Sequence, residues 1–277
     1  MRAFTQVDVF TDTLTQGNPV AVVHDADGLS DEQMAAFSRW TNLSETTFLL
    51  APTDDRADYR LRIFTPGGEL PFAGYPTLGS ARAWLEAGNA PHTPGTLIQE
   101  CGTGLVELRK EGDCLAFAAP PLLRDDPVEP DLIERIASSL RIDLTTIQAS
   151  QWIDNGPGWI GVLLADAETV LALDPDFAAM GDLAIGVIGP DPDAPSPTYE
   201  TRAFVPGLGV PEDPVTGSLA AGFAIWLIGQ KLAPASYTVH QGAALGRHGI
   251  IQIDRDASGT IWVGGNTVVG ITGHAAL

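Results

Sequence analysis

Residues 219–228, LAAGFAIWLI, are the stretch of sequence that decides the fold. Together with the residues before them, they predict a helix over 215–228 whose side chains are apolar on nearly every side. A helix of this kind is normally buried all round. Since the rest of the chain is rich in predicted strands, we expect this helix to lie inside a curved sheet that wraps around it.

An internal repeat extends this expectation to the first half of the chain. Phe64-Thr65-Pro66-Gly67 matches Phe204-Val205-Pro206-Gly207 at an offset of 204 − 64 = 140 residues. Trp84-Leu85 matches Trp226-Leu227 at an offset of 226 − 84 = 142. Offsets of about half the chain predict two similar halves, each with a strand, a turn and a helix in a larger sheet. The alternative is a chance match, because both motifs are short.

Local patterns predict the remaining elements. Alternation of apolar and polar residues indicates strands, expected at Phe4–Phe10, Pro19–His24, Thr46–Leu50, Tyr59–Phe64, Gly95–Glu100, Leu105–Arg109, Leu115–Ala118 and Ile160–Leu164. Capping signals and apolar spacing indicate helices, expected at Ser30–Asn42, Pro76–Ala87 and Asp131–Leu140. In the first of these helices, Met34, Phe37 and Trp40 form the expected apolar face. The Pro-rich, acidic stretch 120–130 is the best candidate for a linker.

Composition and charge exclude several classes of partner. The chain of 277 residues has 15 Lys+Arg against 35 Asp+Glu, a formal net charge of −20. Nucleic acid or an anionic membrane surface would repel such a protein, so we expect neither as a partner. An anionic substrate would need local hydrogen-bond donors. No secretory signal is visible, and the longest apolar run, 219–228, is too short to span a bilayer. We therefore expect a cytoplasmic protein.

Several common chemistries lack their sequence motifs. The chain has no G-x-S-x-G elbow and no phosphate-binding glycine loop. Its five histidines are scattered, and Cys101 and Cys114 make no metal-binding pattern, so we expect no metal site and interpret both cysteines as buried thiols.

Three clusters could carry chemistry: 42–47, 72–77 and 212–218. Glu45 could move a proton if an apolar cleft closes over it, although a solvated Glu at a turn is the simpler interpretation. Asp213 before Pro214 could be just a helix N-cap. Gly217 and Ser218 then need another reason, such as close approach of a ligand. The starts of the two central helices offer backbone N–H groups to an anion.

At these clusters the chain resembles the phenazine-biosynthesis isomerase-like family, which shares the diaminopimelate epimerase fold. The matching stretches are GNPVAVV at 17–23, NLSETTF at 42–48, YRLRIFTPGGELPFAGYPTLGSA at 59–81, VPGLGVPEDPVTGSLAA at 205–221, QGAALGR at 241–247 and VGGNTVV at 263–269. They cover essentially the whole chain in order.

The resemblance implies an α+β fold of two pseudo-symmetric domains, each a mixed sheet or barrel around a central helix. We expect an N-terminal half over 1–125, joined by the strand near 268–277, and a C-terminal half over 126–267. The family also implies a site between the halves, a homodimer, and neither metal nor organic cofactor.

The resemblance assigns roles to individual residues. In true epimerases of this fold two cysteines act as acid and base, but the matching places here hold Ala73 and Asp213. The family's proton-transfer Glu corresponds to Glu45, and its assisting Asp corresponds to Asp213. We expect the substrate to be bound by Asn18, Ser44, Gly74, Tyr75, Thr216, Gly217 and Ser218. Where the family usually has His, this chain has Tyr75, whose phenol can donate a hydrogen bond but is a poor acid–base group near neutral pH.

The sequence therefore predicts a cofactor-independent isomerase that acts on a small carboxylate, amino-acid-derived or a cyclohexadiene, through Glu45. A lyase or tautomerase on the same scaffold is one alternative. A non-catalytic protein that binds small carboxylates is another, and Tyr75 is the feature that favours it.

Overall fold

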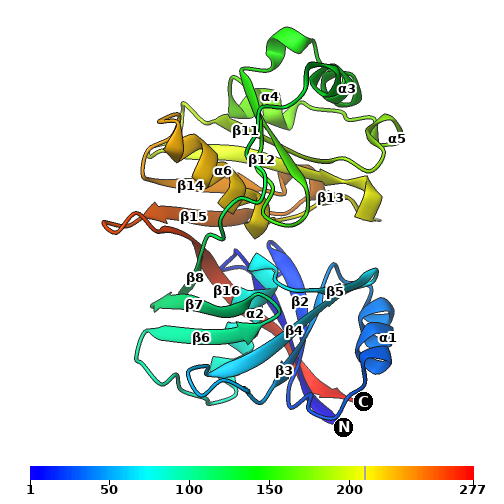
Figure 1. The fold of residues 1–277 in the computed structure, drawn as a ribbon, viewed down its shortest axis with the longest axis vertical. Coiled ribbons are helices and arrows are strands. Elements are labelled where there is room, and N and C mark those ends of the chain that lie inside the picture. Colours follow the sequence, from blue (N-terminus) through cyan, green and yellow to red (C-terminus); the bar gives the residue numbers. More distant parts are fainter. Residues whose placement is uncertain (209) are drawn as a thin grey trace. The chain divides into compact units, whose positions relative to one another are not determined.

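The computed structural model describes residues 1–208 and 210–277. The chain divides into two compact units (Figure 1), unit 1 formed by Met1–Ala118 with Gly264–Leu277 and unit 2 by Ala119–Val263. We propose that these units correspond to the two domains expected from the sequence. The boundary expected at residues 125 and 126 stays a prediction.

Unit 1 contains a barrel that closes on itself. Its strands are β1 (Arg2–Val9), β2 (Asn18–Val23), β3 (Thr46–Leu50), β4 (Tyr59–Thr65), β6 (Thr96–Cys101), β7 (Gly104–Glu111), β8 (Cys114–Ala118) and β16 (Ile261–Ala275), hydrogen-bonded in that order. Antiparallel pairing of β16 with β1 completes the ring and sets Arg2 opposite Ala275 near the two chain ends (Figure 1). Short β5 (Gly68–Leu70) pairs with β4 outside this path.

Helix α2 (Gly74–Glu86) runs through the centre of this barrel. A Cβ atom added at Gly79 would lie 2.3 Å from Val20 Cγ1 and 3.0 Å from Val9 Cγ2, so the helix backbone rests directly on β1 and β2. Leu78 and Ala81 are fully buried. The helix begins two residues earlier than expected, because Pro76 lies within the first turn, where a missing N–H is tolerated.

Helix α1 (Asp31–Thr41) covers the outside of the barrel. The predicted capping box is confirmed, with Ser30 accepting from the Gln33 N–H and the Gln33 side chain accepting from the Ser30 N–H. Met34 packs with the core residue Phe48 as expected. The prediction for Trp40 was wrong. Its side chain is 79% exposed and stacks on Phe37 at the edge of the helix instead of entering the core.

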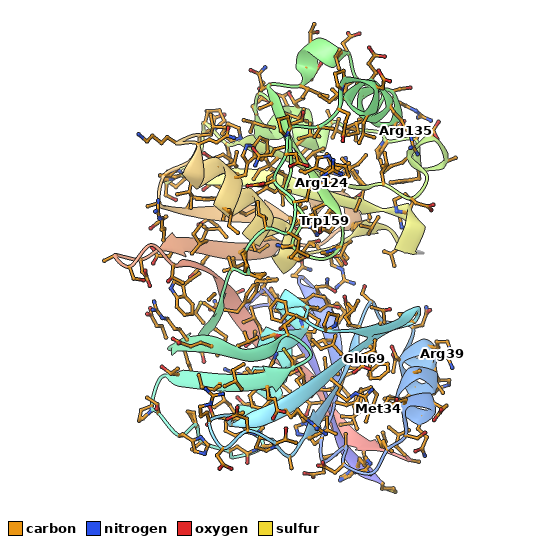
Figure 2. All side chains as sticks on the ribbon, in the orientation of Figure 1. Met34, Arg39, Glu69, Arg124, Arg135 and Trp159 are labelled. Carbon is orange, nitrogen blue, oxygen red and sulfur yellow. The ribbon has the colours of Figure 1, made fainter. Side chains whose placement is uncertain are left out.

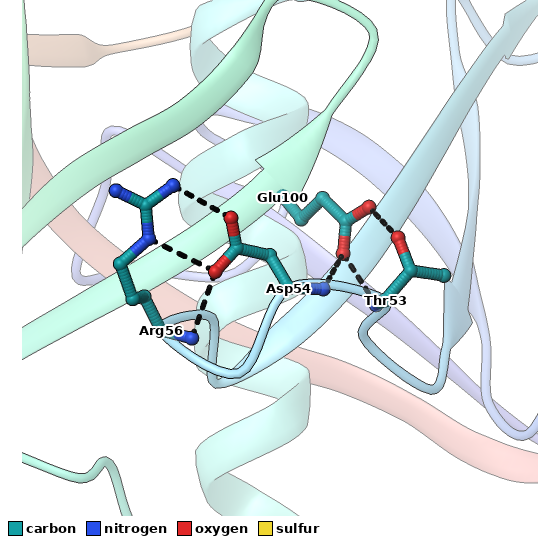
Figure 3. A network of polar contacts seen from close by, with 4 residues as sticks. All are labelled: Thr53, Asp54, Arg56 and Glu100. Carbon is teal, nitrogen blue, oxygen red and sulfur yellow. Dashed lines mark hydrogen bonds and ion pairs between the residues drawn. The ribbon is translucent and has the colours of Figure 1, made fainter.

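A polar network fixes the loop between β3 and β4 (Figure 3). The Glu100 carboxylate on β6 accepts from the backbone N–H groups of Thr53, at 2.6 Å, and Asp54, at 3.2 Å. The Thr53 hydroxyl donates to the same carboxylate. Arg56 forms an ion pair with Asp54 at 2.7 Å. The network holds the loop on β6, and it gives the charged side chains of Glu100, Asp54 and Arg56 a structural role.

Unit 2 is a mixed sheet with helices on it. Its strands are β9 (Ala149–Trp152), β10 (Trp159–Leu163), β11 (Ala184–Pro190), β12 (Thr198–Val205), β14 (Ser236–Gln241) and β15 (Gly249–Arg255), in the spatial order β15-β14-β12-β11-β10-β9, with β13 (Val210–Asp213) added to β12. Its helices are α3 (Pro130–Leu140), α4 (Ala167–Leu171), α5 (Phe177–Met180) and α6 (Gly217–Gly229), with short 3-10 turns at Leu144–Thr146, Pro206–Leu208 and Ala243–Leu245.

Helix α6 is buried as its sequence predicts. A Cβ atom at Gly186 on β11 would lie 2.2 Å from Leu219 Cδ1, and one at Gly161 on β10 would lie 3.1 Å from Trp226 Cζ3. These glycines let the helix approach one face of the sheet. A separate apolar cluster, which includes Ile136, Val170, Met180, Val162 and Phe204, joins α3, α4 and α5 to the sheet.

The repeat appears as the same succession of elements in each unit: β4, β5 and α2 in unit 1, and β12, β13 and α6 in unit 2. It includes an ion pair that the sequence motifs did not reveal. Arg62 on β4 makes a bidentate pair with Glu69, at 2.7 and 2.6 Å. Arg202, at the same offset of 202 − 62 = 140, makes a bidentate pair with Glu212, at 2.9 and 2.9 Å. A chance match of two short motifs would not explain this shared ion pair, so the structure favours two similar halves.

The prediction that both cysteines are buried thiols was wrong. Cys101 and Cys114 are both half-buried and unpaired as disulfides. Each lies at an end of its strand, β6 and β8 respectively, where the hairpin turns leave side chains partly open.

Glu200 on β12 is a buried carboxyl group that makes stability depend on pH. Its side-chain atom Oε1 is buried with no hydrogen-bond partner among the residues described. Burial, reinforced by Asp191 and opposed by Arg202, raises the pKa of Glu200 from 4.5 to about 7. Between these two values the folded chain holds a proton that the unfolded chain has lost. The free energy of unfolding therefore falls as the pH rises through this window.

We expect Glu200→Gln to raise the free energy of unfolding at pH 8 by up to about 3 kcal/mol, because one pKa unit corresponds to about 1.4 kcal/mol. At pH 5 the folded wild type already carries the proton, so the gain should be below about 1 kcal/mol. Urea unfolding followed by tryptophan fluorescence measures both values. The exposed Glu168→Gln is the control. A gain that is equal at both pH values would contradict the assignment.

Candidate functional site

In unit 1 the structure brings Glu45 and Tyr75 together. Glu45 lies between the end of α1 and the start of β3, and Tyr75 is the second residue of α2. The Tyr75 hydroxyl donates a hydrogen bond to Glu45 Oε2. Because Tyr75 is almost fully buried, its ring is held in place and its single O–H orients the carboxylate.

A buried hydroxyl cluster fixes the two elements that carry this pair. Ser80 Oγ on α2 lies 2.8 Å from Thr47 Oγ1 on β3 and 2.7 Å from the Pro76 carbonyl oxygen. Both Ser80 and Thr47 are fully buried. The start of β3 is thus tied to the first turn of α2, so the side chains of Glu45 and Tyr75 meet in a defined geometry.

The other candidates of unit 1 lie in the same part of the fold. Gly74 is the buried first residue of α2, and the preceding Ala73 makes no side-chain cap. Ser44 is half-buried beside Glu45. Asn18 is almost completely buried at the start of β2, opposite Val9.

In unit 2 the structure brings Asp213 and Thr216 together. Asp213 is the last residue of β13 and pairs with Ala203 on β12. The Thr216 hydroxyl donates to Asp213 Oδ2 at 2.5 Å. The interpretation of Asp213 as a helix N-cap was wrong, because strand pairing keeps its backbone extended and Thr216 occupies the N-cap position of α6. The helix therefore starts two residues later than expected.

Ser218, near the start of α6, is contacted by two residues that the sequence motifs did not identify. The Trp159 indole Nε1 donates to Ser218 Oγ at 3.0 Å, and the Asn155 side-chain Nδ2 donates to the Ser218 carbonyl oxygen at 2.8 Å. Figure 2 labels Trp159. An indole N–H can only donate. The Ser218 hydroxyl is therefore an acceptor for Trp159 and keeps its own proton available for donation.

This arrangement suits the N-terminus of α6 to an anionic group. Gly217, its first residue, is buried and has no side chain to obstruct the backbone. Backbone N–H groups at a helix start and an oriented hydroxyl are both donors. They provide the local donors that a protein with a net charge of −20 needs if it is to hold an anion.

Within residues 1–208 and 210–277, no group of three or more His, Cys, Asp or Glu side chains is arranged to hold a metal ion. The rings of His240 and His248 are near each other, with centroids 5.5 Å apart. No helix in this part of the chain is long and apolar enough to cross a membrane.

Comparison with known proteins identifies relatives over the full length. The family model described as "Phenazine biosynthesis-like protein" matches residues 7–277. "Antisense-enhancing sequence 1" of Schizosaccharomyces pombe is 37% identical over 99% of this chain and 98% of its own length. "Trans-2,3-dihydro-3-hydroxyanthranilate isomerase" of Pseudomonas aeruginosa is 32% identical over 100% of both chains. The crystal structure of a phenazine biosynthesis protein of the PhzF family from Enterococcus faecalis covers 100% of this chain and 99% of its own, with a TM-score of 0.82 and 25% identity.

These matches and the architecture define the class: the protein is an isomerase with a two-domain α+β fold of the epimerase type. The chain belongs to the phenazine biosynthesis-like protein family.

Proposed function

We propose that the protein is a cofactor-independent isomerase in which Glu45 moves a proton on a small carboxylate substrate. The observation that carries the proposal is the Glu45 carboxylate held by the buried Tyr75 hydroxyl at the start of α2. A carboxylate with fixed orientation is suited to general acid–base catalysis. The isomerase name of the Pseudomonas aeruginosa relative supports a substrate that is a cyclohexadiene carboxylate or a related amino-acid-derived compound.

In the proposed reaction the Glu45 carboxylate takes a proton from an activated carbon of the substrate. The electron pair of that C–H bond moves into the substrate's conjugated system. The carboxylic acid so formed then gives the proton to another carbon, which restores Glu45 and leaves no net change in oxidation state. Backbone donors at the start of α2, near Gly74, stabilise the negative charge that develops.

We further propose roles for the remaining site residues of each unit. In unit 2, Asp213 orients or assists the reacting part of the substrate, Gly217 and Ser218 bind its carboxylate, and Thr216 contributes to binding. In unit 1, Asn18, Ser44, Gly74 and Tyr75 contribute to substrate binding. The Ser218 hydroxyl accepts from the Trp159 indole and so keeps its own proton for donation, which supports its role in binding the substrate carboxylate.

The test is NMR of candidate substrates incubated with the protein in D2O. The panel contains a dihydro-hydroxyanthranilate and a range of amino and hydroxy acids. Deuterium uptake with a rearranged product supports the isomerase. Uptake without net product indicates an epimerase-like exchange, and an eliminated product indicates a lyase. Binding by calorimetry without any uptake would replace the proposal with a carboxylate-binding protein, the alternative that Tyr75 favours.

The contact between Trp159 and Ser218 gives a prediction about substrate affinity. We expect Trp159→Phe to weaken binding of the identified substrate about 2–10-fold, because one hydrogen bond contributes about 0.5–1.5 kcal/mol. Trp226→Phe is a matched control, because its buried Nε1 has no hydrogen-bond partner among the residues described. Titration calorimetry measures both affinities. Equal losses in the two variants would show that the indole N–H of Trp159 has no role in orienting Ser218.

A homodimer is the proposed assembly, from the resemblance to the family. Light scattering on a sizing column tests it, with twice the 29.2 kDa mass of the chain as the expected result. A mass of one chain would contradict it. The expected cytoplasmic location stays a prediction.

A further inference from the structure

Gln241, the last residue of β14, makes three hydrogen bonds to the turn before α6. Its Oε1 accepts from the backbone N–H of Thr216 at 2.9 Å. Its Nε2 donates to Thr216 Oγ1 and to the Asp213 carbonyl oxygen, both at 2.9 Å. Only 2% of the Gln241 surface is exposed. One buried amide thus holds both ends of the segment 213–216.

The surrounding backbone is built for this contact. Gly242, which follows Gln241, has a φ of +101°, and a Cβ atom there would lie 2.7 Å from the Pro214 carbonyl oxygen. A Cβ atom at Gly249 would lie 2.4 Å from Val215 Cγ2 and 3.0 Å from the Gln241 carbonyl oxygen. Glycines on both sides therefore let the end of β14 approach the turn as closely as the hydrogen bonds require.

The directions of these hydrogen bonds follow from one backbone group. A backbone N–H can only donate, so the Thr216 N–H fixes Oε1 of Gln241 on its side and Nε2 on the other. The Thr216 hydroxyl accepts from that Nε2. Its single proton is then directed to Asp213 Oδ2, which lies at 2.5 Å. Donation to a carboxylate favours its ionised form.

We propose that Gln241 is a positioning residue that, through Thr216, keeps Asp213 ionised and oriented as a hydrogen-bond acceptor for the substrate. The inference rests on the proposed function in giving Asp213 a substrate to face. In this role Asp213 accepts a proton or a hydrogen bond from the substrate, since an ionised carboxylate has no proton to supply. Gln241 itself touches no reacting atom in this assignment.

Gln241→Glu tests the proposal with almost no change of shape. One Glu oxygen still accepts from the Thr216 N–H, but the other can no longer donate to the Thr216 hydroxyl and instead accepts from it. The hydroxyl proton is thereby withdrawn from Asp213. We expect the acid titration of the Asp213 carboxyl to move up by about one pH unit, the change expected for loss of one hydrogen bond to a charged group.

The readout is 13C NMR of aspartate-labelled protein, with the Asp213 resonance assigned from Asp213→Asn. The exposed Gln252→Glu on β15 is the control, because it adds the same charge without contacting Thr216. If Gln241→Glu does not fold, Thr216→Val removes the same donor and Thr216→Ser restores it. An Asp213 titration that moves by less than about 0.3 units in the folded variant overturns the proposal.

The NMR titration separates this inference from the proposed function. A shifted Asp213 titration in a protein that exchanges no substrate proton in D2O leaves the role of Gln241 standing and removes the isomerase mechanism. In an active enzyme, the acid limb of the kcat/KM profile should move by the same amount as the carboxyl titration in Gln241→Glu. A fall in Tm with neither titration changed would reduce Gln241 to a structural residue.

Discussion

Glu45→Gln is expected to lower kcat by about 10²–10⁴-fold, the contribution that a positioned general acid–base group usually makes. The amide has the shape of the carboxylate, and its oxygen can still accept from the Tyr75 hydroxyl that now donates to Glu45 Oε2. It cannot take up a proton from carbon. The loss should therefore appear in kcat, with KM and Tm nearly unchanged.

Steady-state kinetics on the substrate found by deuterium exchange measures the effect. Glu107→Gln is the matched control, because Glu107 is an exposed carboxylate on β7 in the same unit. Circular dichroism melts of both variants show whether folding is preserved. Glu45→Gln with wild-type turnover and exchange would remove Glu45 from the mechanism.

Arg202→Met is expected to lower the free energy of unfolding by about 3–5 kcal/mol, as found when one partner of a buried ion pair is removed. The side chains of Arg202 and Glu212 are only 6% and 7% exposed. Arg202 Nη1 also donates to the Leu173 carbonyl oxygen at 2.7 Å. The substitution leaves a buried carboxylate without its counter-ion, next to Asp213 in the sequence.

The internal repeat supplies the control for this prediction. Arg62 makes the same bidentate pair with Glu69 (labelled in Figure 2), and each Arg lies over a Phe ring, at 5.1 Å from Phe64 and 5.0 Å from Phe204. In unit 1 the pair is partly exposed, at 23% and 41%. Arg62→Met should therefore cost no more than about 1 kcal/mol.

Urea unfolding of the two single variants, and of Arg202→Met combined with Glu212→Met, compares these values. The double variant should recover much of the loss, because no buried charge then lacks a partner. Similar small losses from Arg202→Met and Arg62→Met would show that burial does not determine the contribution of these pairs.

Periodicity and internal repetition made the central parts of the fold predictable. The apolar stretch of α6 has no polar side to present to water, so burial inside a unit was the available solution. The strand, turn and helix order of each half followed from the repeat. The closure of the barrel through β16 has no local pattern, because it pairs the two ends of the chain. The expectation that the strand near 268–277 joins the N-terminal half came from the family resemblance alone.

Local signals failed where tertiary pairing competed with them. Asp213-Pro214 has the composition of a helix start, but pairing with Ala203 keeps Asp213 in a strand. Trp40 has the right spacing for the apolar side of α1, yet its side chain is largely exposed and does not join the core cluster of Met34 and Phe48. The spacing of apolar residues shows which side of a helix faces the core, but it does not show how far along the helix the core extends.

The candidate site was predictable in its residue types and not in its contacts. Glu45 and Asp213 follow from the family motifs, and the structure adds Tyr75 and Thr216 as their partners. Trp159 contacts Ser218 across 59 positions of sequence, so no spacing could have revealed it. Gln241 lay in a matched motif, but its role depends on the direction of its amide.

The closed ring of unit 1 also affects the order in which the two units can fold during synthesis. β16 supplies the strand between β8 and β1, and it leaves the ribosome after every other strand of this ring. Residues 119–263 form a continuous segment and can complete their sheet while the ring is still open. Until then β1 and β8 have unpaired edges, which are prone to association with other strands. A chain that ended at residue 263 would therefore have unit 2 complete, while unit 1 would lack one strand and leave the edges of β1 and β8 open to other strands.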